Sequence, residues 1–506
     1  ALGLCLQALS SYAAVAASEL GVVGLLSDPR SRPSFLQRQA RQHAGAEPQR
    51  RSLAEAIGSH ADAACDAEVG AGRLNKYASL SDEFCNSDSS SSTASFACAA
   101  KWDEKTDRVA RSEDYLCRGS NLQISFKSGA PIKIYGHGSG CQWKLAKDGL
   151  QLKYFLFPEV CSSPYAPLEL HSGSSGEKCT EDLGSKTLFL YSEHDYWNPY
   201  ISQAQALMAY TSAAALDLDL ANTRVLYTSP PSPKENKPKM LPLIEGLFSR
   251  GGASMMPSEQ PRVVCAADVV VPVGGKASFI RKNAGTEDPW ASKCRNAPLL
   301  QSYGPFLLRS FDIAAAAPTS AKERITVLAR QSNKVHPEPF RRSLTNAEEV
   351  EQAIQADGHG MIFQKGSLLQ MSQEAAQNDV LLQVVAALED SVARSQSSTV
   401  EVAQASPELL TISEQAKMFA NTDVLLAPHA AALSWLSVMP KCAQVLEFCA
   451  PGNYQFVNYA KLAGKDHVCL SGVADWGTSR FTANVQEVVK EVQAASDRRA
   501  ECLKKQ

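Results

Sequence analysis

The amino-acid sequence predicts an α/β protein that consists of two facing, doubly wound, Rossmann-like domains and a carboxy-terminal helix. The chain has 506 residues, and a single hydrophobic core stops growing well below this size, so two or more domains are expected. Short apolar runs alternate with segments of helical periodicity in two blocks, which is typical of sheets covered by helices. We expect the two α/β domains at 121–318 and 319–478, followed by a terminal helix at 479–506.

The composition is that of a globular protein without a strong charge bias. Hydrophobic residues make up 44% of the chain, charged residues make up 20%, and the formal net charge is −3. A charge this small predicts no long-range attraction to nucleic acid or to an anionic membrane. The function must therefore depend on a local site.

The amino-terminal segments carry two open alternatives. Residues 1–26 are mostly apolar and long enough to span a bilayer, but interspersed polar residues leave a membrane anchor and an amphipathic surface helix both possible. Arginines recur between residues 30 and 51 with few acids, so an organellar targeting sequence is the alternative to a secretory one. We expect residues 27–120 to form a cysteine-containing stem or irregular region, with folded structure beginning near Leu122.

Cysteine usage indicates disulfides rather than a metal centre. The chain has 14 cysteines, and no two of them have C-x-x-C spacing, which argues against a zinc ribbon or an iron–sulfur cluster. Disulfides place the protein in an oxidising compartment, and we expect the secretory pathway, in the Golgi lumen. Unpaired buried thiols are the alternative, and the absence of an N-x-[ST] glycan acceptor weakens the secretory assignment.

Local patterns predict the elements of both domains. In the first domain, a long helix is expected between 198 and 220, and strands are expected at 122–126, 132–135, 152–157, 188–191, 224–228 and 262–266, the last followed by an apolar run at 269–273. In the second domain, strands are expected at 325–329, 361–364, 399–402, 423–427 and 444–448. Helices are expected at 347–356, 377–393, 413–420, 430–438 and 485–505. In such sheets a ligand binds beyond the carboxyl ends of the strands.

The segment around His429 has the pattern of a phosphate site. An apolar strand, 423–427, runs into Pro428, His429 follows at the turn, and three alanines, 430–432, begin the next helix. The first N–H groups of a helix donate to anions, and small side chains let a phosphate approach the backbone. The alternative is a histidine that caps a turn within a packed core.

This segment resembles the signature of glycosyltransferase family 61. The family shows a strand of the type A-D-V-L-I-G, then P-H-G-A-G-L, then a strand that ends in V-L-E. The chain reads T-D-V-L-L-A-P-H-A-A-A-L at 422–433 and V-L-E-F at 445–448. Tyr459, Ala460 and Gly464 are similar to the family's Y…A…G pattern. Ala430 and Ala432 replace the glycines beside the family's histidine.

A second block resembles the same family at the first strand of this domain. A strand that ends in arginine and a following R-x-x-x-N-E-x-E-like run correspond here to Arg330, Arg342 and Asn346. Arginine is always charged and grips phosphate oxygens with forked donors, as a metal-independent enzyme requires. Solvated surface arginines are the alternative interpretation.

The family's amino-terminal block, N-x-x-H-x-x-x-D, matches only partly. Its position here is 198–205, where Asn198 is kept, Ile201 stands for the histidine and Gln205 stands for the acid. Neither replacement accepts a proton. His194 and Asp195 lie just upstream and are the substitutes in this segment.

The resemblance implies a GT-B architecture and an inverting transfer of a sugar from a UDP-sugar to a hydroxyl of a glycan or protein acceptor. It implies no metal and no cofactor besides the donor. Arg330, Arg342 and His429 would hold the diphosphate, assisted by the helix that starts at Ala430. Asn346 and Glu447 would shape the donor pocket. Asp195, or His194, would act as the base. The alternative is a catalytically degenerate member that serves as a structural or assembly subunit of a complex.

Overall fold

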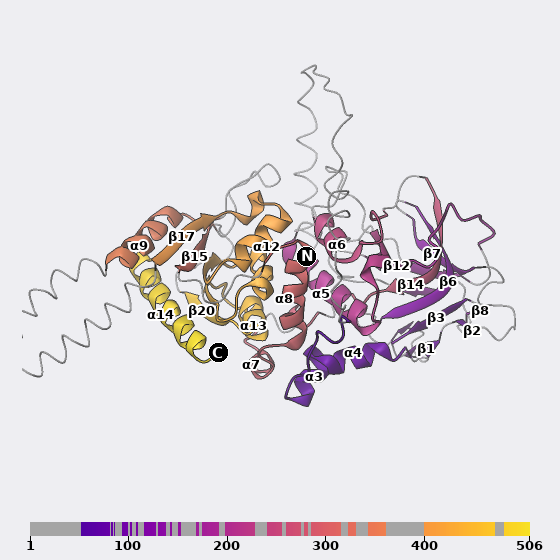
Figure 1. Cartoon of the computed structure of the whole chain (residues 1–506), viewed down its shortest axis with the longest axis horizontal. Helices are drawn as coiled ribbons and strands as arrows, with labels where there is room; N and C mark the ends of the chain where they lie inside the picture. Colours follow the sequence, from indigo (N-terminus) through magenta and orange to yellow (C-terminus); the bar gives the residue numbers. More distant parts are fainter. Residues whose placement is uncertain are drawn as a thin grey trace, which may run out of the picture.

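The computed structural model describes residues 52–80, 94–99, 116–127, 130–137, 175–191, 198–227, 240–255, 260–274, 278–281, 285–314, 322–329, 343–360, 399–470 and 480–506, with short strand segments between 82 and 171. Figure 1 shows two sheets separated by a layer of helices, with the last helix on the outer side of the second sheet. The predicted segments 1–26, 361–364 and 377–393 lie outside the described residues.

The carboxy-terminal half contains the predicted parallel sheet. Its strands are β15 (Lys322–Leu328), β17 (Thr399–Ala405), β18 (Val424–Pro428), β19 (Gln444–Phe448) and β20 (Asp466–Leu470). They lie in the order β17-β15-β18-β19-β20, and every neighbouring pair is parallel. In chain order this is 2-1-3-4-5, a doubly wound arrangement whose switch point lies between β15 and β18.

Helices cover both faces of this sheet. The helices α9 (Ala347–Gly360) and α14 (Val485–Lys504) pack on the outer face, where Val350, Val488 and Val492 share a core with the strands. On the inner face lie α12 (Ile412–Ala420), the 3-10 helix η5 (Ala431–Val438) and α13 (Gln455–Leu462).

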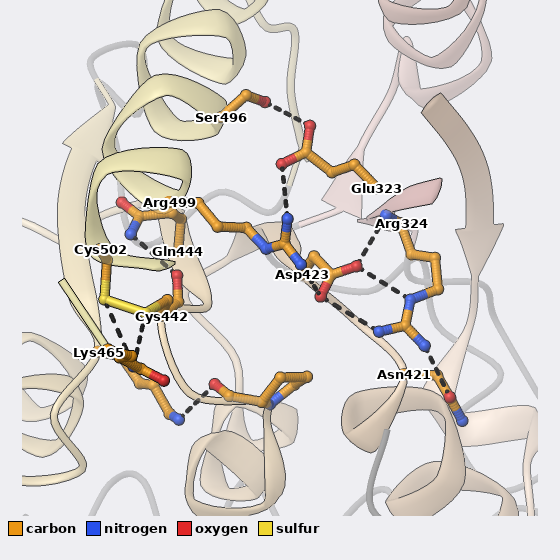
Figure 2. A network of polar contacts seen from close by, with 12 residues as sticks. Glu323, Arg324, Asn421, Asp423, Cys442, Gln444, Lys465, Ser496, Arg499 and Cys502 are labelled. Atoms are coloured by element: carbon orange, nitrogen blue, oxygen red, sulfur yellow. Dashed lines mark hydrogen bonds and ion pairs between the residues drawn. A yellow bond between two sulfur atoms is a disulfide. The ribbon is translucent and has the colours of Figure 1, made fainter. Parts of the chain in front are cut away.

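A buried polar network fixes α14 to the amino-terminal end of the sheet (Figure 2). The Asp423 carboxylate is fully buried and accepts hydrogen bonds from the guanidinium groups of Arg324 on β15 and Arg499 on α14, at 3.0 and 2.9 Å. Ser496 on α14 donates to Glu323 at 2.7 Å, and Cys502 on α14 forms a disulfide with Cys442. Because the hydrogen-bonded ions neutralise one another, their burial is tolerated.

The amino-terminal sheet differs from the prediction, because it is mixed rather than doubly wound and parallel. The strands β12 (Thr187–Tyr191), β13 (Thr223–Tyr227) and β14 (Arg262–Val271) pair in parallel. Next to them β14 pairs antiparallel with β6 (Cys117–Phe126), and β6 pairs antiparallel with β7 (Ile132–Gly136). The burial of β7 alternates strictly, as in antiparallel sheets, whereas β12 is buried throughout, as parallel strands are. The smaller strands are β1 (Asp82–Glu83), β2 (Cys85–Asn86), β3 (Ser95–Cys98), β4 (Trp102–Asp103), β5 (Arg108–Val109), β8 (Gln142–Trp143), β9 (Leu150–Leu152), β10 (Leu168–His171) and β11 (Glu181–Asp182). Of these, β11 pairs in parallel with β14, and β10 pairs in parallel with β7.

Folded structure begins earlier than the sequence predicts. Two helices, α3 (Ala63–Val69) and α4 (Ala71–Ala78), occupy part of the expected stem. Cys65, Val69 and Tyr77 from these helices are fully buried in the central core. The expectation of an irregular region is therefore wrong for residues 63–78, because two very short helices leave too few turns for a helical period to show in the sequence.

The layer between the sheets consists of α5 (Pro199–Ala215), α6 (Leu241–Phe248), α7 (Pro289–Lys293) and α8 (Pro298–Ser310). Its core is continuous with the inner face of the parallel sheet. At Gly304 a β-carbon would lie 2.1 Å from the carbonyl oxygen of Ser437, so only glycine permits the close approach of α8 and η5.

Five disulfides connect described residues. They are Cys65–Cys294, Cys98–Cys117, Cys179–Cys265, Cys442–Cys502 and Cys449–Cys469. Such a set fits a secretory or extracellular compartment. Among the helices of the described ranges, none combines the length and the apolar character that crossing a bilayer requires.

Candidate functional site

The carboxyl-end half of the parallel sheet contains a buried carboxylate held between two imidazoles. His429 follows β18, Glu447 lies on β19, and His467 lies on β20. The Nδ1 atom of His429 lies 2.5 Å from Oε1 of Glu447, and Nε2 of His467 lies 2.6 Å from Oε2. We call this arrangement the His–Glu–His cluster. Its three side chains are at most 4% exposed.

The backbone explains why these side chains meet. All five residues of β18 are buried, so the strand is fixed between its neighbours until it ends at Pro428. The His429 amide then donates to the Phe448 carbonyl at 3.2 Å, which holds the turn beside the end of β19. Val445 on β19 pairs with His467 on β20. Because side chains two residues apart point to the same face, Glu447 and His467 face the same side of the sheet.

Electrostatics favours an ionised Glu447. Burial raises the pKa of this carboxyl, but the hydrogen bonds from His429 and His467 outweigh burial, so the pKa lies below its ordinary value. Glu447 is thus a carboxylate at neutral pH. It accepts through both oxygens, which orients each imidazole and fixes which ring nitrogen faces away from it.

The first turn of α5 approaches the cluster through aromatic contacts. The Phe456 ring lies 4.9 Å from the His429 ring and 5.4 Å from the Tyr200 ring, measured between centroids. Tyr200 donates to the Ile280 carbonyl at 2.7 Å, and Asn198 caps α5 by accepting from the Tyr200 amide. The helix that the resemblance assigns to catalysis therefore begins near His429.

The structure brings together only part of the predicted site. His429 and Glu447 are in direct contact, and Ala430 follows as the N-terminal cap of η5. Arg330, Arg342, His194 and Asp195 lie outside the described residues.

The structure describes Asn346, whose side chain forms hydrogen bonds with the backbone of Ala483. Its Oδ1 accepts from the Ala483 amide at 2.9 Å, and its Nδ2 donates to the Ala483 carbonyl at 3.1 Å. This pair of bonds joins the start of α9 to the segment before α14. A contact between Asn346 and a sugar donor stays a prediction.

The helix after His429 is a 3-10 helix rather than the expected α-helix. It spans Ala431–Val438, and its first carbonyl, that of Ala430, accepts from the Leu433 amide at 3.0 Å. The tighter winding follows from close packing, because α5, α8 and α12 all contact η5. The amino-terminal end of the helix still follows His429 directly.

The two positions that differ from the family's catalytic block are buried within α5. Ile201 is 8% exposed, and Gln205 is fully buried with its Nε2 donating to the Val273 carbonyl at 3.4 Å. This turn of α5 therefore serves packing.

Sequence reasoning missed His467. The residue lies in the run Lys465-Asp466-His467, which has no apolar pattern, and its strand was not predicted. The one available signal is the pair of cysteines Cys449 and Cys469. Their disulfide joins the end of β19 to β20, the strand that carries His467.

The fold and the cluster together define an α/β protein with a doubly wound carboxy-terminal sheet and a histidine–carboxylate cluster that begins at the carboxyl end of β18. A comparison with protein-family models finds no family that matches this chain. No curated protein sequence matches it either.

Proposed function

We propose that this protein is an inverting glycosyltransferase similar to glycosyltransferase family 61, with a GT-B architecture, which transfers a sugar from a UDP-sugar to a hydroxyl of a glycan or protein in the Golgi lumen. The observation that carries the proposal is the position of His429. It follows β18, one of the two strands at the switch point of the 2-1-3-4-5 sheet, where doubly wound proteins bind nucleotides.

The fixed orientation of His429 supports a role in holding the diphosphate. Its Nδ1 is bonded to Glu447, so Nε2 is the ring atom that would donate to a phosphate oxygen. Because Glu447 already orients the His429 ring, the imidazole meets a developing negative charge without reorganisation. Arg330, which follows β15 in the sequence, and Arg342, which precedes α9, would supply the remaining positive charge. No metal would be required.

The acceptor side of the reaction depends on the segment before α5. An inverting transfer needs a base that removes the proton of the acceptor hydroxyl while UDP departs. In this proposal Asp195 is that base, and His194 is the alternative at the same place.

A second function is favoured by the packing of α5. Ile201 and Gln205 are buried where the related family has a histidine and an acid. A protein with a kept fold and a lost base would serve as a structural subunit of a complex.

Titration with UDP separates the two functions. A ligand that binds only the folded protein stabilises it by about 2.7 kcal/mol at a concentration of 100 times its dissociation constant. We expect millimolar UDP to raise the unfolding temperature by a few degrees, and chelation of metals to leave this rise unchanged. Absence of any rise with UDP, together with absence of sugar transfer, favours the structural subunit.

A further inference from the structure

The disulfide Cys449–Cys469 lies against the His–Glu–His cluster. Cys449 directly follows β19. Cys469 lies on β20, where it pairs with Glu447 of β19, and His467 on β20 faces the same side of the sheet as Cys469. The two sulfur atoms and one ring nitrogen of His467 all lie within 4.8 Å of one another. Cys469 is exposed and Cys449 is half-buried, so solvent reaches this disulfide.

Two thiolates and one imidazole are ligands that zinc takes in proteins, and the two sulfur atoms, which are bonded to each other here, would separate on reduction. Zinc binds cysteine sulfur at about 2.3 Å in tetrahedral sites, which places ligand atoms roughly 4 Å apart. As a disulfide the cysteines cannot bind the metal. Reduction by a dithiol transfers two electrons and two protons to the sulfur atoms of Cys449 and Cys469, while the dithiol itself becomes a disulfide. The two cysteine thiols then lose their protons when zinc binds.

The orientation of His467 provides the independent support. Its Nε2 is bonded to the buried Glu447 carboxylate at 2.6 Å. Among the described residues, Nδ1 of His467 has no hydrogen-bond partner. A histidine that donates one nitrogen to a carboxylate and turns the other to a metal is the common arrangement of zinc-binding histidines.

We propose that the reduced protein binds one zinc ion through Cys449, Cys469 and Nδ1 of His467, with Glu447 as the positioning residue and the fourth position open to water. This inference does not depend on the proposed function. The same carboxylate holds His429, so the metal would lie next to the candidate phosphate site.

A second disulfide offers a matched control. Cys179 and Cys265 lie near His137, whose Nδ1 is 3.6 Å from the sulfur of Cys265. Cys265 is buried, and within the described part of the chain no carboxylate is bonded to His137. The proposal therefore assigns high affinity to the first set of ligands and not to the second.

Cobalt binding to the full chain tests the site. The protein is reduced with dithiothreitol, the reductant is removed under argon, and Co²⁺ is titrated while thiolate–metal absorption is recorded. We expect one equivalent of thiolate-bound Co²⁺, displaced by Zn²⁺. Cys449→Ser/Cys469→Ser should lose this equivalent and Cys179→Ser/Cys265→Ser should keep it. Glu447→Gln should weaken the affinity roughly 10–100-fold.

A second variant keeps the test valid if reduction of the other disulfides unfolds the chain. Cys449→His/Cys469→His presents three imidazoles without any reductant and should bind one Co²⁺ while the remaining disulfides stay intact. Absence of bound metal in both the reduced wild type and this variant overturns the proposal. Full retention of the thiolate absorption in Cys449→Ser/Cys469→Ser overturns it as well.

Discussion

At both ends of the parallel sheet a buried carboxylate is bonded to two basic side chains, but the basic residues differ. At the amino end, the Asp423 carboxylate lies between Arg324 and Arg499 (Figure 2). At the other end, Glu447 lies between His429 and His467. Both carboxylates are almost completely buried. Arginine keeps its charge at every accessible pH and forms a fork of bonds, whereas histidine changes its charge near neutrality.

We infer that the arginine pair and the histidine pair have different roles. The arginine pair joins β15, the start of β18 and α14, so its loss would weaken the attachment of the terminal helix to the sheet. His429 lies where a doubly wound sheet binds its ligand, and Glu447 is bonded to one nitrogen of each histidine ring. We infer that the amino end stabilises the fold and the carboxyl end carries the function.

The largest effect is expected for Asp423→Ala. This change leaves the buried guanidinium group of Arg499 and the partly exposed one of Arg324 without this carboxylate, and breaking such a pair costs roughly 3–5 kcal/mol of unfolding free energy. Urea denaturation measures the loss. Asn421→Ala removes the acceptor of one Arg324 bond at 2.9 Å and the donor of one bond to the Lys417 carbonyl at 2.8 Å, and should cost roughly 1–2 kcal/mol. Equal losses for the two variants would contradict the anchoring role of Asp423.

A smaller loss is expected for Glu447→Gln, and it should depend on pH. The pKa of Glu447 is lowered in the folded protein, so its stabilising contribution is present above the ordinary carboxyl pKa of about 4.3 and is lost as the pH falls through the folded value. We expect a loss of roughly 1–3 kcal/mol at neutral pH.

Denaturation at several pH values checks this prediction. The difference between wild type and Glu447→Gln should be constant from neutrality to mildly acidic pH and should shrink below that. A difference that grows under acidic conditions would show that Glu447 is protonated in the folded protein.

The buried Lys465 near the amino end should make stability depend on pH on the alkaline side of neutrality. Its Nζ donates to the carbonyls of Met439 and Pro440, at 2.8 and 2.7 Å, and burial lowers the pKa of this lysine to about 7. Between this value and the ordinary lysine pKa the unfolded chain binds more protons, so stability rises with pH.

Lys465→Met removes this dependence. The stability of wild type relative to Lys465→Met should increase by at most about 1.4 kcal/mol per pH unit between neutral and alkaline pH. Thermal unfolding at pH values on both sides of neutrality measures it. A constant difference over this range would mean that the lysine stays protonated in the folded state.

The parts of the molecule that the sequence predicts well are those with strong local patterns. The strand before His429 is a continuous apolar run, the strand that carries Glu447 has a Val-Leu pair and a final Phe, and α14 has a clear amphipathic period, so each is predicted within a residue or two. The resemblance placed His429 and Glu447 in one site, and the structure shows them in contact.

Other features depend on contacts between distant residues. His467 reaches Glu447 only because β19 pairs with β20. The mixed strand directions of the first sheet likewise result from pairing between strands that are distant in the sequence. The short helix α3 is stabilised by the Cys65–Cys294 disulfide, whose partners are 229 residues apart. No local pattern encodes such contacts, so propensity and periodicity could not reveal them.

Calorimetric titration of UDP into His429→Ala and Asn421→Ala tests the central claim most directly, because the two changes lie at opposite ends of the same sheet. Loss of a charge-assisted hydrogen bond of about 1.5–3 kcal/mol should weaken UDP binding roughly 10–100-fold in His429→Ala. Asn421→Ala should bind UDP as the wild type does. Equal affinities for UDP in wild type and His429→Ala, with both proteins folded, would contradict the assignment of the carboxyl end to the nucleotide.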